Sequence, residues 1–192
     1  MFVGSRQMQI RDEAKGISLP ALVLYPTEIP SVPTAFGPYT LDVSPDAPVA
    51  EGRFPVVVIS HGNGGSHLIY RAVSTHLARN GYVVAMLEHA GNNRNNNELE
   101  GTHENLVNRP RHVRLTIDAV SSDPWFRACA QPDGYTALAV AGGTPWSETR
   151  QRVDVVADPR VRALVLLAPT TACQRSPKIP PPRSPKNPPL LG

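Results

Sequence analysis

The stretch FPVVVISHGNGGSHLIYRAVSTHLARNGYVVAMLEH, residues 54–89, decides the fold. It opens with a β-branched run over residues 54–60, which is typical of a parallel strand that is buried on both faces. A second apolar run covers residues 82–87. Between the two lies a glycine-rich turn, formed by His61, Gly62, Asn63, Gly64 and Gly65. The stretch predicts one βαβ unit whose glycine turn lies at the edge where α/β sheets bind ligands.

The spacing predicts a helix between the two strands, with Ser66 as its N-cap. Ile69, Val73 and Leu77 recur at i, i+4 and i+8, so we expect them to form one apolar stripe against the sheet. Gly81 ends the helix, because glycine tolerates the left-handed conformation that follows a last helical turn.

Residues 7–12 and 17–25 read as two strands joined by a short polar turn, which predicts an antiparallel hairpin beside a mostly parallel sheet. Residues 26–52 are rich in proline and lack apolar periodicity, so we expect a surface excursion without regular structure. The run at 91–97 is polar and rich in asparagine. It predicts an exposed loop, with a mobile lid over a site as the alternative.

A second helix is predicted with Pro110 in its first turn and with Val113, Ile117 and Val120 on its buried face. Residues 121–133 contain no convincing strand, and residues 134–142 read as a further helix. Two helices in succession lack the strand that a right-handed crossover requires. We therefore expect the central strand of the sheet to be missing, with the next buried strand over residues 161–167.

Length and charge give weaker guidance. The 192 residues suffice for one domain, and the formal net charge of +3 owes much to cations near the C-terminus, so nucleic acid is not implied. Cys129 and Cys173 match neither a disulfide framework nor a zinc site. There is no apolar run of bilayer length and no signal-peptide pattern, which favours a cytoplasmic protein with no membrane span.

The last twenty residues, 173–192, are rich in proline and favour a disordered tail. Residues 181–185 within it are an alternative candidate as a ligand for an SH3-type groove.

Residues 54–65 and 77–89 resemble the α/β-hydrolase superfamily, most closely the branch of platelet-activating-factor acetylhydrolases and dienelactone-hydrolase-like esterases. The resemblance continues more weakly from the N-terminal hairpin to about Pro169. It implies an incomplete α/β-hydrolase domain over residues 1–172, a small ester or lipid-like substrate, and no cofactor or metal. In such proteins the residue after His-Gly offers its backbone N–H to the oxyanion of the reaction. That residue is Asn63 here, within a loop formed by His61, Gly62, Gly64 and Gly65.

The catalytic residues that the resemblance implies are not found. The family's nucleophile lies in a Gly-x-Ser-x-Gly elbow, and no such pentapeptide occurs in this sequence. Matching Gly134 to the glycine that follows the elbow places Gln131 at the serine position, and an amide cannot serve as a nucleophile. Neither Ser66 nor Cys129 is a convincing substitute.

Ala168 and Pro169 stand where one branch carries its acid, and the triad histidine is expected in the part that the proline-rich tail replaces. These absences predict that the chain descends from this family but is inactive as an esterase. It would then be a remnant or a binding protein. A deletion or a frameshift would explain the lost elbow.

Two other patterns occur in the sequence, of which the first stays open as an alternative. Gly62-Asn63-Gly64 after a strand, with Glu88 at the end of the next strand, imitates a nucleotide-binding βαβ unit, although His67 stands at the third glycine position. His103-Glu104 opens like a zinc-binding HExxH motif, but Val107 replaces the second histidine, so we expect no metal.

Overall fold

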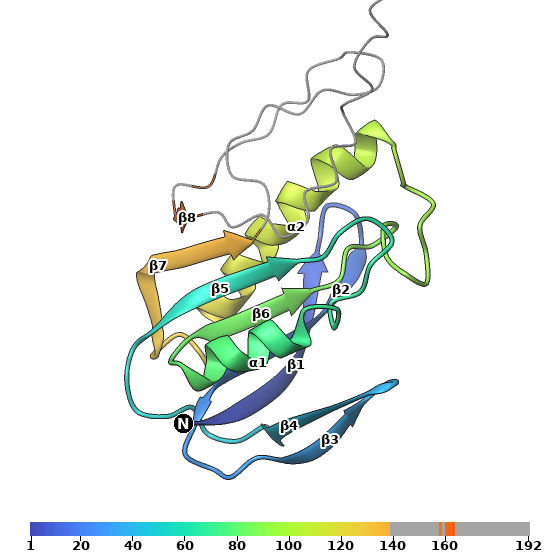
Figure 1. Ribbon diagram of the computed structural model, residues 1–192. Helices are drawn as coiled ribbons and strands as arrows, with labels where there is room; N and C mark the ends of the chain where they lie inside the picture. Colours follow the sequence, from blue (N-terminus) through green and yellow to red (C-terminus); the bar gives the residue numbers. More distant parts are fainter. Residues whose placement is uncertain (139–157, 159, 164–192) are drawn as a thin grey trace, which may run out of the picture.

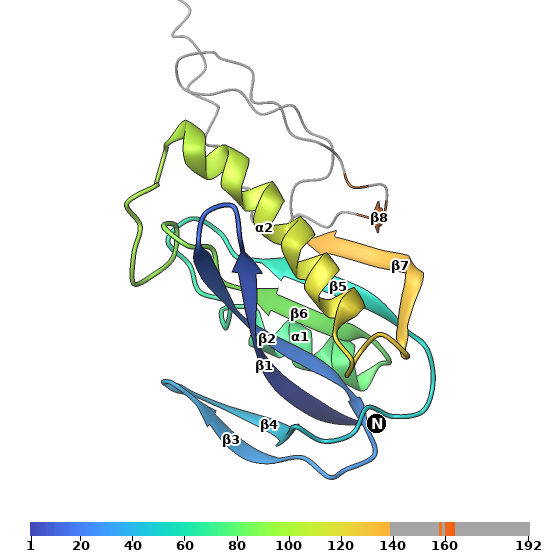
Figure 2. The same cartoon turned by 180° about the vertical axis from the view of Figure 1, so that it is seen from behind.

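A computed structural model describes residues 1–138, 158 and 160–163 of the chain. Its strands lie in the order β3-β4-β1-β2-β6-β5-β7-β8 (Figure 1). The elements are β1 (Phe2–Asp12), β2 (Ile17–Thr27), β3 (Val32–Phe36), β4 (Tyr39–Pro45), β5 (Phe54–Ser60), α1 (Arg71–Arg79), β6 (Val83–Leu87), α2 (His103–Ser122), β7 (Ala130–Leu138) and β8 (Val161–Ala163). Helix α1 covers one face of the sheet and α2 the other, as the two opposite views show (Figures 1 and 2).

The predicted N-terminal hairpin is confirmed. β1 and β2 pair antiparallel from Phe2 opposite Thr27 to Asp12 opposite Ile17, and β2 continues antiparallel onto β6. The chain that follows corrects our expectation, because residues 26–52 are not irregular but contain the β3–β4 hairpin. β4 alternates, with Leu41 and Val43 buried between exposed polar side chains, but β3 buries no side chain, so the hairpin as a whole has a weak apolar signal.

The βαβ unit is confirmed, with β5 and β6 parallel from Val56 opposite Val83 to Ser60 opposite Leu87. Helix α1, however, begins at Arg71 rather than at Ser66. It also buries a different face, because Ser74 and Ala78 contact the sheet while Ile69 and Val73 are exposed. Small side chains at the contact let the helix lie close to the sheet, and the predicted stripe is wrong at two of its three positions.

Helix α2 begins seven residues before Pro110, at His103, where the Thr102 hydroxyl accepts a hydrogen bond from the Asn105 amide (3.1 Å). Pro110 therefore lies inside the helix and not in its first turn, which corrects the prediction. The buried face is confirmed, since Val113, Ile117 and Val120 are all at most 5% exposed. They pack against one face of the sheet together with Phe126 and the side chains of β5 and β6 that point the same way.

The expected gap beside β5 is filled. Residues 130–138 form β7, which pairs parallel to β5 from Val56 opposite Tyr135 to Ile59 opposite Leu138. The helix predicted over 134–142 is thus wrong for residues 134–138; residues 139–142 lie outside the described part. Without β7, the N–H and C=O groups of β5 would stay unpaired along one edge in the middle of the sheet, and pairing them outweighs a local helical pattern.

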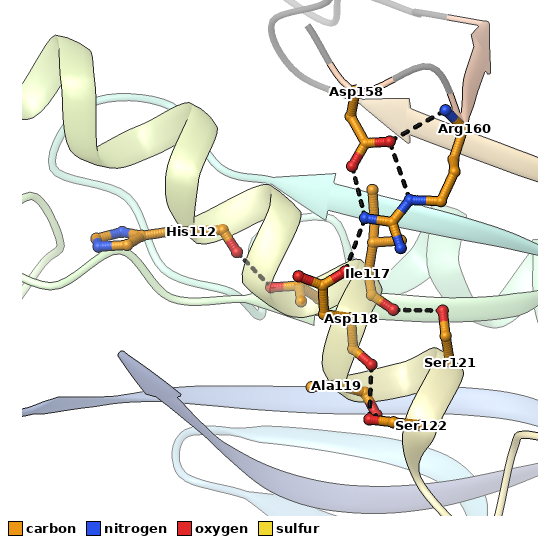
Figure 3. Close-up of polar contacts among 9 residues, drawn as sticks. His112, Ile117, Asp118, Ala119, Ser121, Ser122, Asp158 and Arg160 are labelled. Carbon is orange, nitrogen blue, oxygen red and sulfur yellow. Dashed lines mark hydrogen bonds and ion pairs between the residues drawn. The ribbon is translucent and has the colours of Figure 1, made fainter. Parts of the chain in front are cut away.

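Beyond β7 the structure describes little. Arg160 bonds Asp158 (2.6 Å) and Asp118 of α2 (2.7 Å), which ties the start of β8 to the helix (Figure 3). The strand predicted over 161–167 is confirmed for residues 161–163. Its remaining residues and the proline-rich segment 173–192 lie outside the described part.

Candidate active site

The glycine loop lies at the carboxyl end of β5, as predicted. Gly64 has a φ of +59°, in the left-handed region that favours glycine. A Cβ on Gly65 would lie 3.0 Å from both the Gly62 carbonyl oxygen and His61 Nδ1, so this position also needs glycine. The Gly65 amide donates to the Gly62 carbonyl (3.1 Å), which closes the turn.

Two N–H groups at the tip of this loop stay available to a ligand. Asn63 is exposed. Neither its backbone N–H nor that of Gly64 has a hydrogen-bond acceptor among the described residues. Two adjacent amides held in a turn are the kind of donor pair that stabilises an oxyanion. The oxyanion role expected of Asn63 stays a prediction.

The side chain of Arg109, from helix α2, contacts the base of the glycine loop. Its guanidinium donates to Asn92 Oδ1 (2.6 Å), to Ser60 Oγ (3.1 Å) and to the carbonyl oxygen of His61. None of these acceptors carries a negative charge. Burial lowers the Arg109 pKa to about 10, which still leaves the guanidinium protonated at neutral pH.

The asparagine run is exposed at residues 94–96, as expected, but its first part is buried and Asn92 contacts this arginine, which corrects the expectation for residues 91–93. Asn92 is fully buried and Asn93 is 8% exposed. The Asn92 amide group donates to Asn63 Oδ1 and to Asn97 Oδ1 (2.7 Å). The Glu100 carboxylate, which is exposed, accepts from Asn63 and Asn97 at the outer end of this network.

Three buried histidines lie beneath the loop. His89 Nε2 is 2.6 Å from Ser60 Oγ, and His89 Nδ1 is 3.1 Å from His112 Nδ1. The His89 backbone amide donates to His61 Nε2 (3.1 Å). Burial lowers the pKa of His61, that of His89 strongly, and that of His112 to about 4. The charge of Arg109 acts in the same direction on all three, so this cluster is neutral at pH 7.

One further pair lies beside the loop. His67 Nδ1 is 2.8 Å from Glu88 Oε2, and both side chains are mostly buried. Cys129 lies at the amino end of β5, away from the glycine loop. Its carbonyl accepts a hydrogen bond from the backbone amide of Phe54, the first residue of that strand (2.7 Å). Burial raises the pKa of its thiol, so Cys129 is not a substitute nucleophile.

In the described part of the chain, no group of three or more histidine, cysteine or carboxylate side chains is placed to hold a metal ion. No helix there has the length and apolar character needed to cross a bilayer.

Sequence reasoning found the loop but missed the residues that hold it. Arg109, Asn92 and His112 carried no signal, because each belongs to a segment read as a polar loop or as a helix face. The structure also brings His89, which follows β6, into contact with Ser60 at the end of β5. The one hint in the sequence was that a serine, Ser60, ends one predicted strand and a histidine, His89, follows the other.

Part of the sequence is similar to one family of known proteins. Residues 26–114 match the family profile described as platelet-activating factor acetylhydrolase, isoform II. A platelet-activating factor acetylhydrolase of Canis lupus familiaris is 38% identical over 55 residues, which cover 28% of this chain and 12% of that protein.

The solved structure of an esterase shows the same fold. A ferulic acid esterase from Streptomyces cinnamoneus superposes with a TM-score of 0.58 at 18% identity, over 71% of this chain and 51% of the esterase. A dienelactone hydrolase-like protein from Klebsiella pneumoniae gives a lower TM-score of 0.46 at 16% identity, over 71% and 49%. The chain thus has a partial α/β-hydrolase fold and spans about half the length of that esterase. Within that fold, residues 26–114 are similar to the platelet-activating factor acetylhydrolases.

Proposed function

We propose that this chain carries the oxyanion-binding part of a carboxylic-ester hydrolase site and that, as a 192-residue chain, it does not turn over esters. The observation that carries the proposal is the pair of unpartnered amides of Asn63 and Gly64 at the carboxyl end of β5. A small ester or lipid-like molecule would place its carbonyl oxygen there. Each such donor contributes roughly 3 kcal/mol to a transition state, but only if a nucleophile creates one.

The nucleophile is what the chain lacks. β7 lies beside β5, where the family's elbow would follow the strand. The residues after Leu138 are Ala139, Val140 and Ala141, which carry no hydroxyl or thiol. The alternative match, with Gln131 at the serine position, leads to the same conclusion. Loss of the serine in a triad enzyme removes about a millionfold of kcat.

A competing nucleophile has one observation in its favour, the 2.6 Å contact between Ser60 Oγ and His89 Nε2. Two features weigh against it. The His89 side chain is fully buried, and its low pKa makes it a weak base. The Ser60 oxygen also accepts a hydrogen bond from Arg109, which withdraws electron density from it.

The nucleotide-binding alternative is weaker. Glu88, which would bind a ribose hydroxyl, is engaged by His67 instead. The neighbour of β6 is the antiparallel strand β2, whereas a dinucleotide-binding sheet would continue in parallel.

The test is hydrolysis of p-nitrophenyl acetate together with labelling by a fluorophosphonate probe, on the wild-type chain and on Ser60→Ala. We expect equal background rates and no covalent label on either protein. Labelling of any serine would refute the proposal. A label that Ser60→Ala abolishes, and that Ser66→Ala on the same loop retains, would assign catalysis to the Ser60–His89 pair.

A further inference from the structure

The loop that offers the two amides is held by a residue outside it. The carbonyl of His61 and the side chain of Asn92 are both bound by Arg109, which is 48 and 17 residues away in the sequence. Asn92 in turn donates to the side chain of Asn63. Gly62, the flexible residue between His61 and Asn63, is therefore fixed from both sides.

We propose that Arg109 is the positioning residue of the oxyanion loop, which it anchors at His61 and, through Asn92, at Asn63, while its charge favours an anion at the loop tip. The inference rests on the proposed function, because it names what prepares the same two amides for an anion. A planar guanidinium suits this task, since it donates in fixed directions to several acceptors at once. An ammonium group at the same place would keep the charge and lose the geometry.

The charge of Arg109 is unusual in its surroundings. Its three acceptors are an amide oxygen, a hydroxyl and a backbone carbonyl, so no carboxylate neutralises the guanidinium directly. The three histidines on which its charge acts, His61, His89 and His112, are kept neutral by burial. A positive charge that is partly buried is screened less by water and salt than one that is fully exposed. It therefore favours negative charge at the loop tip.

Arg111 supplies a matched control on the same helix. It lies two residues further on and forms an ion pair with Asp12 of β1. No contact joins it to the loop among the described residues. Replacing Arg111 with lysine keeps its charge and its partner, so it reports the general cost of altering an arginine in α2.

The experiment measures the backbone amide signals of Asn63 and Gly64 by 15N NMR, with and without dimethylphosphinate, a tetrahedral anion of single charge. We expect saturable shifts in the wild type and in Arg111→Lys. Arg109→Ala should weaken binding about tenfold or more, because a charge-assisted anchor is lost, and Arg109→Lys should fall between. Guanidinium, well below denaturing concentrations, should restore the two signals in Arg109→Ala.

The outcomes separate the two proposals. If the wild type does not bind the anion, the oxyanion role fails, but the positioning claim is still decided by the amide signals without anion. Unchanged signals of Asn63 and Gly64 in a folded Arg109→Ala or Arg109→Lys would overturn it. If Arg109→Ala does not fold, Arg109→Lys decides alone: displaced loop signals support the anchor, and wild-type signals refute it.

Discussion

Two arginines of helix α2, separated only by Pro110, meet opposite surroundings. Arg111 forms an ion pair with Asp12, a carboxylate that is fully buried. Arg109 binds three neutral oxygens at the glycine loop. In the first case two charges cancel and join the helix to β1. In the second, no carboxylate of the described residues binds the Arg109 guanidinium, which lies near the two unpartnered backbone N–H groups of Asn63 and Gly64. The same residue type thus secures the fold on one side of the helix and prepares a site on the other.

The pKa of Asp12 follows from this difference. Burial alone would raise it, but the hydrogen bond and the charge of Arg111 outweigh burial and lower it. Asp12 is therefore ionised in the folded chain and depends on its partner. No comparable carboxylate depends on Arg109.

The largest effect is expected from removing the ion pair between Arg111 and Asp12. Arg111→Met leaves the buried Asp12 carboxylate without its charged partner and with the Lys15 backbone amide as its remaining donor, which should lower the free energy of unfolding by about 3–5 kcal/mol. Urea unfolding measures it. The control is Lys15→Met, which removes an exposed ion pair with Glu104 and should cost about 1 kcal/mol or less. Equal costs for the two variants would contradict the assignment of Arg111 to stability.

The second effect lies on the Arg109 side and depends on pH. His61, His89 and His112 have folded pKa values below their ordinary value of 6.5, so the unfolded chain takes up protons first as the pH falls. The stability that these groups contribute is fully present above pH 6.5. It is lost below that pH, down through their folded pKa values. For His112, with a folded pKa of about 4, the loss amounts to about 3 kcal/mol between those limits.

Urea unfolding from pH 7 to pH 4 checks this expectation. His112→Leu should show a shallower decline than the wild type, because one buried group no longer titrates. His76→Gln alters an exposed histidine at the end of α1 and should leave the decline unchanged. A wild type with constant stability over this range would rule out a neutral buried cluster.

The sequence predicts the glycine loop beside Arg109 and the strands that carry it, but not Arg109 itself. The β5–α1–β6 unit and its loop could be predicted, because β-branched runs, a helical segment and paired glycines act locally. The hairpin of β1 and β2 has the same kind of local signal. What gives the site its character is not local. Arg109 contacts residues 48 and 49 positions away, and no pattern around it distinguishes it from a solvated arginine on a helix.

Three errors have the same cause. The asparagine run was read as exposed because it is polar, yet Asn92 is buried with its hydrogen bonds supplied by Arg109, Asn63 and Asn97. Residues 134–138 were read as helical, yet β5 required a strand partner. Ile69 and Val73 were read as buried, yet Ser74 and Ala78 lie against the sheet. Each time, a partner distant in the sequence decided the outcome.

The third prediction sharpens the comparison within the loop. Gly65→Ala would place a Cβ 3.0 Å from the Gly62 carbonyl and from His61 Nδ1, so the turn that Arg109 anchors must shift. We expect a loss of about 1–2 kcal/mol in stability and displaced amide signals for Asn63. Gly62→Ala is the control, because its Cβ would meet nothing within 4 Å and its φ is not positive. If the two variants behave alike, the tight turn is not what holds the loop.

The smallest effect concerns the outer end of the polar chain that starts at Arg109. Glu100 accepts hydrogen bonds from Asn63 and Asn97, and its negative charge opposes an anion at the neighbouring amides. Glu100→Gln keeps an acceptor and removes the charge, so dimethylphosphinate should bind about two- to threefold more tightly, which is the scale of exposed charge effects. Glu98→Gln, an exposed change on the same loop, should have a smaller effect. Because the Glu100 carboxylate is exposed, salt should remove its influence, whereas more of the contribution of the partly buried Arg109 should persist. A Glu100 effect that survives high salt would mean that this carboxylate acts through the geometry of Asn63 and not through its charge.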